Sequence, residues 1–237
     1  MIADIKGIGW VTAEGMGCAR DHNAFAMTEG RLPSITRKSV FAKPYSYFRR
    51  LDEYSRLGLA AIAFALRDAG REEWTQKRHI GIIASTEYGC LKTDIAYFDT
   101  VMPQQGNGAS PALFSYTLPN SFLGEAAIRF GLTGPTFAIN EQVPLGPACL
   151  QMALDSIACG EADMMLCGVC NLEYPPPFSA ISKVPPGALF FMIEKSPGKG
   201  CSYGTLRLNR EGHIEFKGRE ITDLNLLVRQ CLAGCSD

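Results

Sequence analysis

Ten consecutive apolar residues, LGLAAIAFAL at positions 57–66, constrain most strongly how this chain can fold. They lie in a longer segment, 47–69, whose apolar residues recur at helical spacing, and Gly70 follows it as a stop signal. A helix that is apolar on every side has to be buried on every side. The run is also only half of the roughly twenty residues that a membrane-spanning helix needs. The segment therefore predicts a helix inside the core of a globular protein.

Short apolar segments surround this helix in the sequence, and they predict strands at 4–11, 79–85, 135–141, 163–170 and 188–194. Strands without apolar–polar alternation are typical of sheets that are covered on both faces. Further helices are expected at 92–102, 119–130, 145–160 and in DLNLLVRQCL near the C-terminus, with Gly131 and Gly160 as stop signals. A hairpin is expected at 205–216, and irregular segments at 13–44 and 104–111. This order predicts one α/β domain with layered α-β-α architecture and a mainly parallel, mixed sheet.

The composition excludes several classes of function. Hydrophobic residues make up 46% of the 237 residues, enough for a packed core, and 23 basic residues against 24 acidic ones give a net charge of −1. Without a basic excess, neither nucleic acid nor an anionic membrane is an expected partner. Asp4 and Lys6 interrupt the apolar run that a secretory signal would need, so we expect a cytoplasmic protein.

The nine cysteines are an odd number, and several lie inside apolar runs. This placement predicts reduced, buried thiols and no disulfide framework. Cys149 falls within an expected helix, and the CxxC formed by Cys167 and Cys170 falls within an expected strand. Both positions favour core packing over a nucleophilic, redox or metal-binding role. The glycines of QQGNGAS at 104–110 lack the strand and lysine of a phosphate loop, so no nucleotide site is expected.

Four segments, in order along the chain, resemble the β-ketoacyl synthases of the thiolase fold. They are RRLDEYSRLGLAAIAFALRDAG (49–70), FGLTGPTFAINE (130–141), GEADMMLCGVCN (160–171) and ALFFMIEKS (188–196). The resemblance implies a thiolase-like N-terminal half, with residues 1–237 as a single domain and without the C-terminal catalytic half. A half-fold of this kind is expected to leave one sheet face uncovered, and exposed apolar surface of that size usually finds a partner.

The resemblance also locates the position of the nucleophile. In the family, a nucleophilic cysteine stands at the tenth position from the glycine of the Gly-Pro pair, where backbone N–H groups and a helix dipole lower its pKa. Counting from Gly134 makes Val143 the tenth residue, and valine cannot be acylated. Gln142, just before it, is similar to the glutamine that chain length factors carry in place of that cysteine. Either Gln142 or Val143 occupies the nucleophile position, and no catalytic residue is implied there.

The histidines of this chain do not match the catalytic histidines of an active ketosynthase. Active members draw two histidines from the C-terminal half of the fold, where they polarise the thioester carbonyl. The three histidines of this chain, His22, His79 and His213, fall in an early loop, ahead of a strand and in a hairpin. Surface or strand-edge positions are expected for them. No metal and no cofactor are implied.

Two further sets of residues are candidates for substrate and partner contacts. The resemblance implies that the segment around Leu113, Phe114 and Phe122 lies at the dimer interface and lines the end of an acyl tunnel, although core packing is the simpler interpretation of all three. It also implies a strand that pairs antiparallel with its counterpart across a dimer axis. That strand comprises Thr136, Phe137, Ala138, Ile139, Asn140 and Glu141.

These observations favour a non-catalytic partner subunit. The leading hypothesis is a homologue that acts like a chain length factor, pairing with an active β-ketoacyl synthase in a type II polyketide or fatty acid pathway such as that of the aryl polyenes. The pair would be a heterodimer, or the chain would form a homodimer, and it would meet an acyl carrier protein. Two alternatives stay open: a stand-alone acyltransferase or thioesterase that uses another residue, and a binding module for acyl carrier protein.

Overall fold

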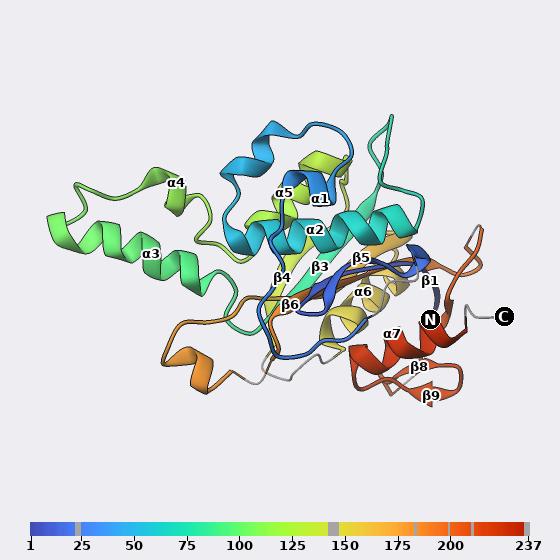
Figure 1. The fold of residues 1–237 in the computed structure, drawn as a ribbon. Helices are drawn as coiled ribbons and strands as arrows, with labels where there is room; N and C mark the ends of the chain where they lie inside the picture. The colour runs from blue at the N-terminus through green and yellow to red at the C-terminus, as the bar shows by residue number, and fades with distance from the viewer. Residues whose placement is uncertain (22–24, 142–146, 183, 199, 210, 235–237) are drawn as a thin grey trace.

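A nine-stranded mixed sheet is the centre of the structure, a computed structural model that describes residues 1–21, 25–141, 147–182, 184–198, 200–209 and 211–234 (Figure 1). Along the sheet the strands follow the order β4-β3-β5-β6-β1-β7-β8-β9, and β2 pairs with β1. Their bounds are β1 Ile2–Thr12, β2 Gly15–Cys18, β3 Ile80–Thr86, β4 Thr136–Asn140, β5 Met164–Asn171, β6 Gly187–Lys195, β7 Gly204–Leu208, β8 Ile214–Phe216 and β9 Arg219–Glu220.

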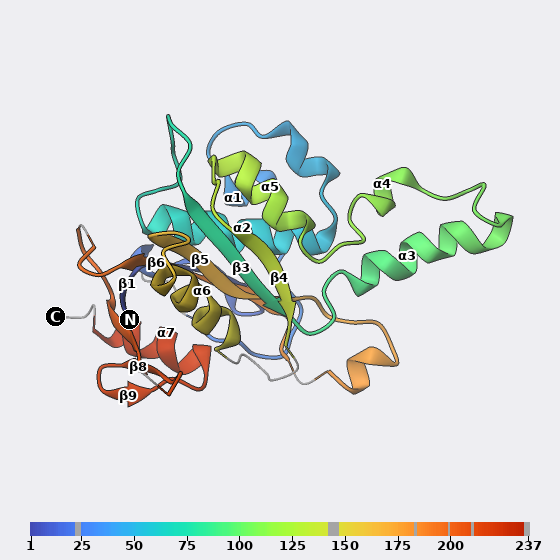
Figure 2. The same cartoon turned by 180° about the vertical axis from the view of Figure 1, so that it is seen from behind.

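Helices cover both faces of the sheet (Figures 1 and 2). On one face α2 and α5 join one core cluster, and on the other face α6 and α7 join a second core cluster. The three-layer α-β-α arrangement predicted from the sequence is therefore confirmed. The helices are α1 Arg37–Val40, α2 Glu53–Asp68, α3 Leu91–Val101, α4 Pro111–Phe114, α5 Ser121–Phe130, α6 Ala148–Ala158 and α7 Leu224–Ala233, with short 3-10 turns η1 Ala19–Asp21, η2 Ser46–Arg50, η3 Met102–Gln104 and η4 Phe178–Ala180.

The sheet is mixed as predicted, but its parallel part is smaller than the mainly parallel sheet that was expected. Parallel pairing is found between β4 and β3 and between β3 and β5, whereas β6 pairs antiparallel with both β5 and β1. A parallel neighbour requires a crossover connection, which is usually a helix. The segment between β5 and β6 contains only the short turn η4 among its described residues, so the chain returns antiparallel.

Small residues allow α2 to lie unusually close to β1. A Cβ atom added at Gly9 would lie 2.2 Å from the backbone nitrogen of Ala65, and one at Gly7 would lie 2.3 Å from the carbonyl oxygen of the same residue. Because backbone atoms cannot move aside as a flexible side chain can, neither position has space for a side chain. This close contact explains why the buried helix is rich in alanine.

We expect Gly9→Ala to destabilise the protein by about 1–3 kcal/mol, because the added methyl group overpacks the contact between β1 and α2. Gly124→Ala is the matched control, since nothing lies within 4 Å of a Cβ atom at Gly124 in α5. There alanine is expected to stabilise the helix by about 0.5–1 kcal/mol. Urea unfolding of both variants checks the prediction, and equal stability of the two would contradict it.

The second sheet face is not bare, so the expectation of an uncovered half-fold is wrong for the described residues. Four residues of α7 at positions i, i+3, i+4 and i+7 form an apolar stripe, and all four are fully buried in the second core cluster: Leu224, Leu227, Val228 and Cys231. The same cluster contains Ile5 of β1 and Phe216 of β8. The C-terminal strands and helix therefore supply the cover that the expectation had assigned to a missing half.

Helices α3 and α4 project together away from the layered body (Figures 1 and 2). We call residues 91–118 the arm. Thr93 is the only residue of α3 and α4 that is buried among those whose side chains the structure describes. Five large apolar side chains of the arm are instead more than a third exposed: Ile95, Phe98, Met102, Phe114 and Leu118. An apolar surface of this kind marks an interaction site more often than a free face.

Two further expectations concern the whole chain. No disulfide joins any two of the eight described cysteines, which confirms the prediction of no disulfide framework for this part of the chain. Among the helices of the described residues, none is long and apolar enough to cross a membrane.

Candidate functional site

Three parallel strands end side by side at one edge of the sheet, and each ends in a polar residue. These residues are Thr86 of β3, Asn140 of β4 and Asn171 of β5. In sheets of this type, ligands bind in the crevice beyond the carboxyl ends of the parallel strands. We take this edge, together with the residues that follow each strand, as the candidate site.

Asn171 is the centre of a buried hydrogen-bond network at this edge. Its Oδ1 atom accepts hydrogen bonds from the Thr86 hydroxyl at 3.2 Å, the Glu87 backbone N–H at 2.8 Å and the Tyr174 hydroxyl at 3.1 Å. Asn140 adds a further bond, in which its Nδ2 donates to the carbonyl oxygen of Glu87. One amide side chain thus joins the ends of β3 and β5 and positions the loop that follows β3.

A buried carboxylate and an aromatic cluster complete the described part of the site. Glu87 is only 6% exposed, and its Oε2 atom accepts a hydrogen bond from the Ser182 hydroxyl. Tyr88 lies edge-on to Tyr174, with ring centroids 5.0 Å apart, and to Phe178 at 5.7 Å. The loop after β5 is therefore fastened to the loop after β3 through both polar and aromatic contacts.

Glu141 lies at the same edge of the sheet, where its N–H donates to the carbonyl oxygen of Thr86 at 2.9 Å. Glu141 follows β4 directly, and its Oε1 atom accepts a hydrogen bond of 3.4 Å from the N–H of Ala148, the first residue of α6. Gln142 and Val143, the two candidates for the nucleophile position, lie outside the described residues. The choice between them does not affect the chemistry, because the whole connection from 141 to 147 reads EQVPLGP and contains no cysteine, serine, threonine or histidine.

The cysteines near this edge are not activated. Cys149 lies in the first turn of α6 and is fully buried, and this burial raises the pKa of its thiol to about 12. Burial likewise raises the pKa of Cys167 and of Cys170 well above the usual value. A nucleophilic cysteine needs a lowered pKa and some access to substrate. The expectation that these three residues pack in the core is confirmed.

The described histidines lie elsewhere. His79 precedes β3, and its Nε2 atom is 2.7 Å from the carbonyl oxygen of Glu161 at the amino end of the parallel strands. His213 lies in the turn between β7 and β8, 3.4 Å from Glu220. His22 lies outside the described residues. Neither described histidine can therefore assist chemistry at the candidate site.

The structure does not bring the three expected tunnel residues together. Phe122 is fully buried in the first core cluster, with its ring edge-on to Tyr54 at 5.3 Å and to Phe190 at 6.2 Å. Phe114 is instead 61% exposed on the arm, where its ring contacts Tyr97 of α3 at 5.5 Å, and Leu113 is partly buried beside it. Phe122 packs as a core residue, which leaves only Leu113 and Phe114 accessible to a partner or substrate.

The expected interface strand is the outermost strand of the sheet. Within the described part of the chain β4 pairs only with β3, and the residues of β4 are half-buried or exposed. The carbonyl oxygen of Pro135 and the N–H of Glu141 both form hydrogen bonds with β3. Because the backbone groups of successive residues in a strand point to alternate sides, those of Phe137 and Ile139 point toward β3 as well. The N–H and C=O groups of Thr136, Ala138 and Asn140 therefore point to the open edge.

We expect Asn171→Leu to destabilise the protein by about 2–3 kcal/mol, because it leaves three buried donors without their acceptor. Tyr174→Phe is the matched variant; it removes one of these donors, and about 1 kcal/mol is expected. Urea unfolding distinguishes the two. Equal losses would show that Asn171 is not the centre of the network.

Sequence comparison identifies the family. Residues 29–182 match the family described as β-ketoacyl synthase, N-terminal domain. The chain belongs to this family. The candidate site, with Thr86, Asn140 and Asn171, lies within the matched residues of this ketosynthase domain, whereas β1, β2, β6–β9 and α7 lie wholly outside them.

Curated relatives are ketosynthases of several pathways. A polyketide β-ketoacyl synthase of Streptomyces halstedii is 27% identical over 198 aligned positions, and the alignment covers 73% of this chain and 46% of the relative. The 3-oxoacyl-(acyl-carrier-protein) synthase 2 of Vibrio cholerae is 29% identical over 121 residues, 51% of this chain and 29% of the relative. The chain thus matches less than half the length of these curated relatives.

Solved ketosynthase structures share the fold. The ishigamide ketosynthase/chain length factor superposes with a TM-score of 0.65 at 14% identity, covering 86% of this chain and 62% of that one. The ketosynthase ApeO in complex with its chain length factor ApeC, from Xenorhabdus doucetiae, gives a TM-score of 0.57 at 19% identity and covers 84% of this chain and 81% of that one. The fold is therefore the thiolase-like fold of ketosynthases, as predicted.

Sequence analysis missed the network around Asn171. Its members come from segments 31 to 85 residues apart, so no local motif unites them. A weaker signal was present, because Thr86-Glu87, Asn140-Glu141 and Asn171 each end an apolar strand. Polar residues at the carboxyl ends of strands that become parallel neighbours are expected to meet.

Proposed function

We propose that this chain is a non-catalytic ketosynthase homologue, which acts as the chain-length-factor-like partner of an active β-ketoacyl synthase. The pathway would be a type II polyketide or fatty acid pathway of the aryl polyene kind. The observation that carries the proposal is the connection between β4 and α6. It stands where the family places its nucleophile, yet residues 141–147 offer no side chain that can form a thioester.

The surface of the ketosynthase domain supports a partner role. The open edge of β4 offers unpaired backbone donors and acceptors, which are a template for pairing with a strand from another subunit. On α5, which contacts β4, Ile128 is 77% exposed. The exposed apolar side chains of the arm add to this surface. We propose that β4 pairs antiparallel with its counterpart in the ketosynthase and that the arm packs against the same subunit.

Comparison with solved complexes supports the assignment of the partner. One such structure is the complex of ApeO with its chain length factor ApeC. Its similarity to the present protein extends over 84% of the present chain and 81% of the matched chain, so the two are similar over most of their lengths. Another similar structure is a ketosynthase in complex with a type II acyl-carrier protein. We therefore propose an acyl carrier protein as the second partner, which delivers substrate to the active ketosynthase subunit. Residues 1–237 are proposed to serve in this role as a single ketosynthase-like unit.

Co-expression with candidate ketosynthases tests the proposal. A 1:1 complex that survives gel filtration is expected with the true partner. A chain that is eluted alone in the presence of every candidate, and that binds acyl carrier protein by itself, would support the binding-module alternative instead. Acyl transfer or thioester hydrolysis by the isolated chain would support the enzyme alternative.

A further inference from the structure

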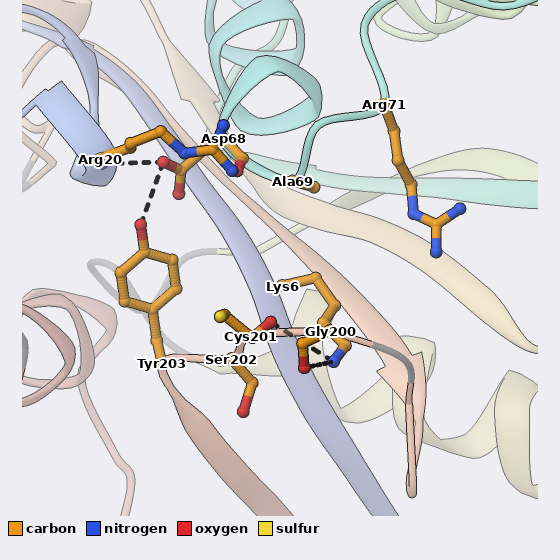
Figure 3. A pocket seen from close by; sticks show the side chains of 9 residues that line it. All are labelled: Lys6, Arg20, Asp68, Ala69, Arg71, Gly200, Cys201, Ser202 and Tyr203. Carbon is orange, nitrogen blue, oxygen red and sulfur yellow. Dashed lines mark hydrogen bonds between the residues drawn. The ribbon is translucent and has the colours of Figure 1, made fainter.

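A cavity of about 390 Å³ lies between Lys6, Arg20, Asp68, Arg71 and residues 200–203 (Figure 3). Strand pairing places Asp4 of β1 beside Glu194 of β6, and Glu194 beside Met164, the first residue of β5. The cavity is therefore near the amino ends of the parallel strands. Its walls come from four separate parts of the chain: β1, η1 with Arg20, the region from the end of α2 to Arg71, and residues 200–203 ahead of β7.

Lys6 is a buried cation in the wall of this cavity. Its side chain is only 5% exposed, and among the described residues its ammonium group donates to the carbonyl oxygens of Gly200 at 3.3 Å and Cys201 at 3.4 Å. The nearest carboxylate oxygen, Oδ2 of Asp4, is 3.9 Å away. A buried charge is costly unless it is closely paired and hydrogen-bonded. Lys6 therefore has only weak compensation for its charge within the described structure.

The neighbouring carboxylates are held by other donors. Asp4 accepts hydrogen bonds from the N–H of Gly198 at 3.0 Å and the hydroxyl of Thr205 at 2.9 Å. Asp68 accepts hydrogen bonds from three donors: the backbone N–H groups of Ile8 and Arg20 and the hydroxyl of Tyr203. These bonds hold both carboxylates to the backbone and to hydroxyl groups, and the ion pair of Asp4 with Lys6 is long, at 3.9 Å.

Two guanidinium groups add to the positive charge. The guanidinium group of Arg20 donates to the backbone carbonyl oxygen of Asp68, while the Asp68 carboxylate is bonded by the Arg20 backbone N–H. Arg71 reaches Glu194 only through long contacts of 3.4 and 3.5 Å, and its side chain is 29% exposed. Arginine favours planar, bidentate recognition of carboxylate or phosphate. Among the described residues, the side-chain hydrogen bonds of Arg20 and Arg71 use one guanidinium nitrogen of each, which leaves their other N–H groups to donate to a ligand in the cavity.

We propose that this cavity is a binding site for a phosphate-bearing small molecule, whose phosphate group is held by Lys6, Arg71 and Arg20. The volume is well above the roughly 30 Å³ that one water molecule takes up in the liquid, so it accommodates a phosphate and several further heavy atoms. Lys6, Arg20 and residues 200–203 lie outside the family match at 29–182, whereas Arg71 lies within it, so the site joins the matched ketosynthase domain to segments on either side of it. The inference does not depend on the proposed partnership.

Binding of inorganic pyrophosphate tests the site. A ligand that binds only the folded chain raises its unfolding temperature by mass action. At saturating pyrophosphate we expect a rise of about 5 °C or more for the wild-type chain. Isothermal titration is expected to show saturable binding that weakens at least about tenfold in Arg71→Gln, because one charge-assisted contact is lost.

Matched variants separate the site from general charge effects. Arg71 is partly exposed, so Arg71→Gln is expected to fold even if the buried substitution Lys6→Met does not. Arg49→Gln removes an exposed arginine outside the cavity and is expected to bind pyrophosphate like the wild type. The proposal fails if sodium chloride at equal ionic strength gives the same rise, if Arg49→Gln and Arg71→Gln lose binding equally, or if no saturable binding is found.

Discussion

Replacing Ala138 with proline is expected to weaken association with the ketosynthase partner by about tenfold or more while the chain still folds. The N–H of Ala138 points to the open edge of β4, as inferred from the bonds that Pro135 and Glu141 make to β3. Proline removes this donor and leaves the pairing of β4 with β3 intact, a position that edge strands tolerate. A net loss of about 1.4 kcal/mol, the upper range for one hydrogen bond, corresponds to tenfold.

The neighbouring position provides the control. The backbone N–H of Ile139 points toward β3, so Ile139→Pro is expected to destabilise the chain itself. Thr136→Val changes a side chain on the same edge without removing a backbone donor, and it is expected to keep association near the wild-type level. Gel filtration and titration of the complex measure the effect. An Ala138→Pro chain that is folded and associates normally would place the interface elsewhere.

The second large effect separates two phenylalanines that sequence analysis had grouped together. Phe122→Ala is expected to cost about 3–5 kcal/mol, because it opens a cavity beside Tyr54 and Phe190 in the core. That is a large share of the roughly 5–15 kcal/mol that stabilises a typical domain. Phe114→Ala, on the exposed face of the arm, is expected to change stability by no more than about 0.5 kcal/mol. Urea unfolding measures both.

Phe114 is instead expected to act on the product, if Leu113 and Phe114 line the end of the partner's acyl tunnel as the family resemblance implies. Each buried CH₂ group contributes about 0.8 kcal/mol until the chain meets a wall, where overpacking costs roughly 1–3 kcal/mol. Phe114→Ala in the reconstituted pair should therefore lengthen the product by one or more two-carbon units without slowing the first condensation. Mass spectrometry of the products checks this. An unchanged distribution of product lengths for both Leu113→Ala and Phe114→Ala would show that the arm does not set the chain length.

Much of the fold was predictable because its signals are local. The strands at β3, β5 and β6 are apolar at nearly every position, and Gly131 and Gly160 close α5 and α6 with positive φ angles of 63° and 76°. The start of α2 was placed too early, at residue 47. Asp52 is the true N-cap, since its side chain accepts a hydrogen bond from the N–H of Ser55 at 2.9 Å.

The features that the sequence did not reveal depend on contacts between distant segments. The expectation of a bare sheet face assumed that the C-terminal residues do not reach it, yet the stripe of α7 packs there beside Ile5 and Phe216. Phe114 and Phe122 were grouped because they are close in sequence. In the structure, the ring of Phe122 packs against Gly58 of α2, whereas Phe114 lies on the exposed arm. In both cases tertiary packing decides which apolar residues are buried.

The central claim, that this ketosynthase homologue carries no nucleophile, is tested most directly by acyl loading of the assembled pair. The complex with its ketosynthase is incubated with acyl carrier protein charged with an acyl group, denatured, and both subunits are measured by intact mass spectrometry. We expect the acyl mass increase on the ketosynthase alone and none on this chain. An acyl adduct retained on this chain after denaturation would contradict the account.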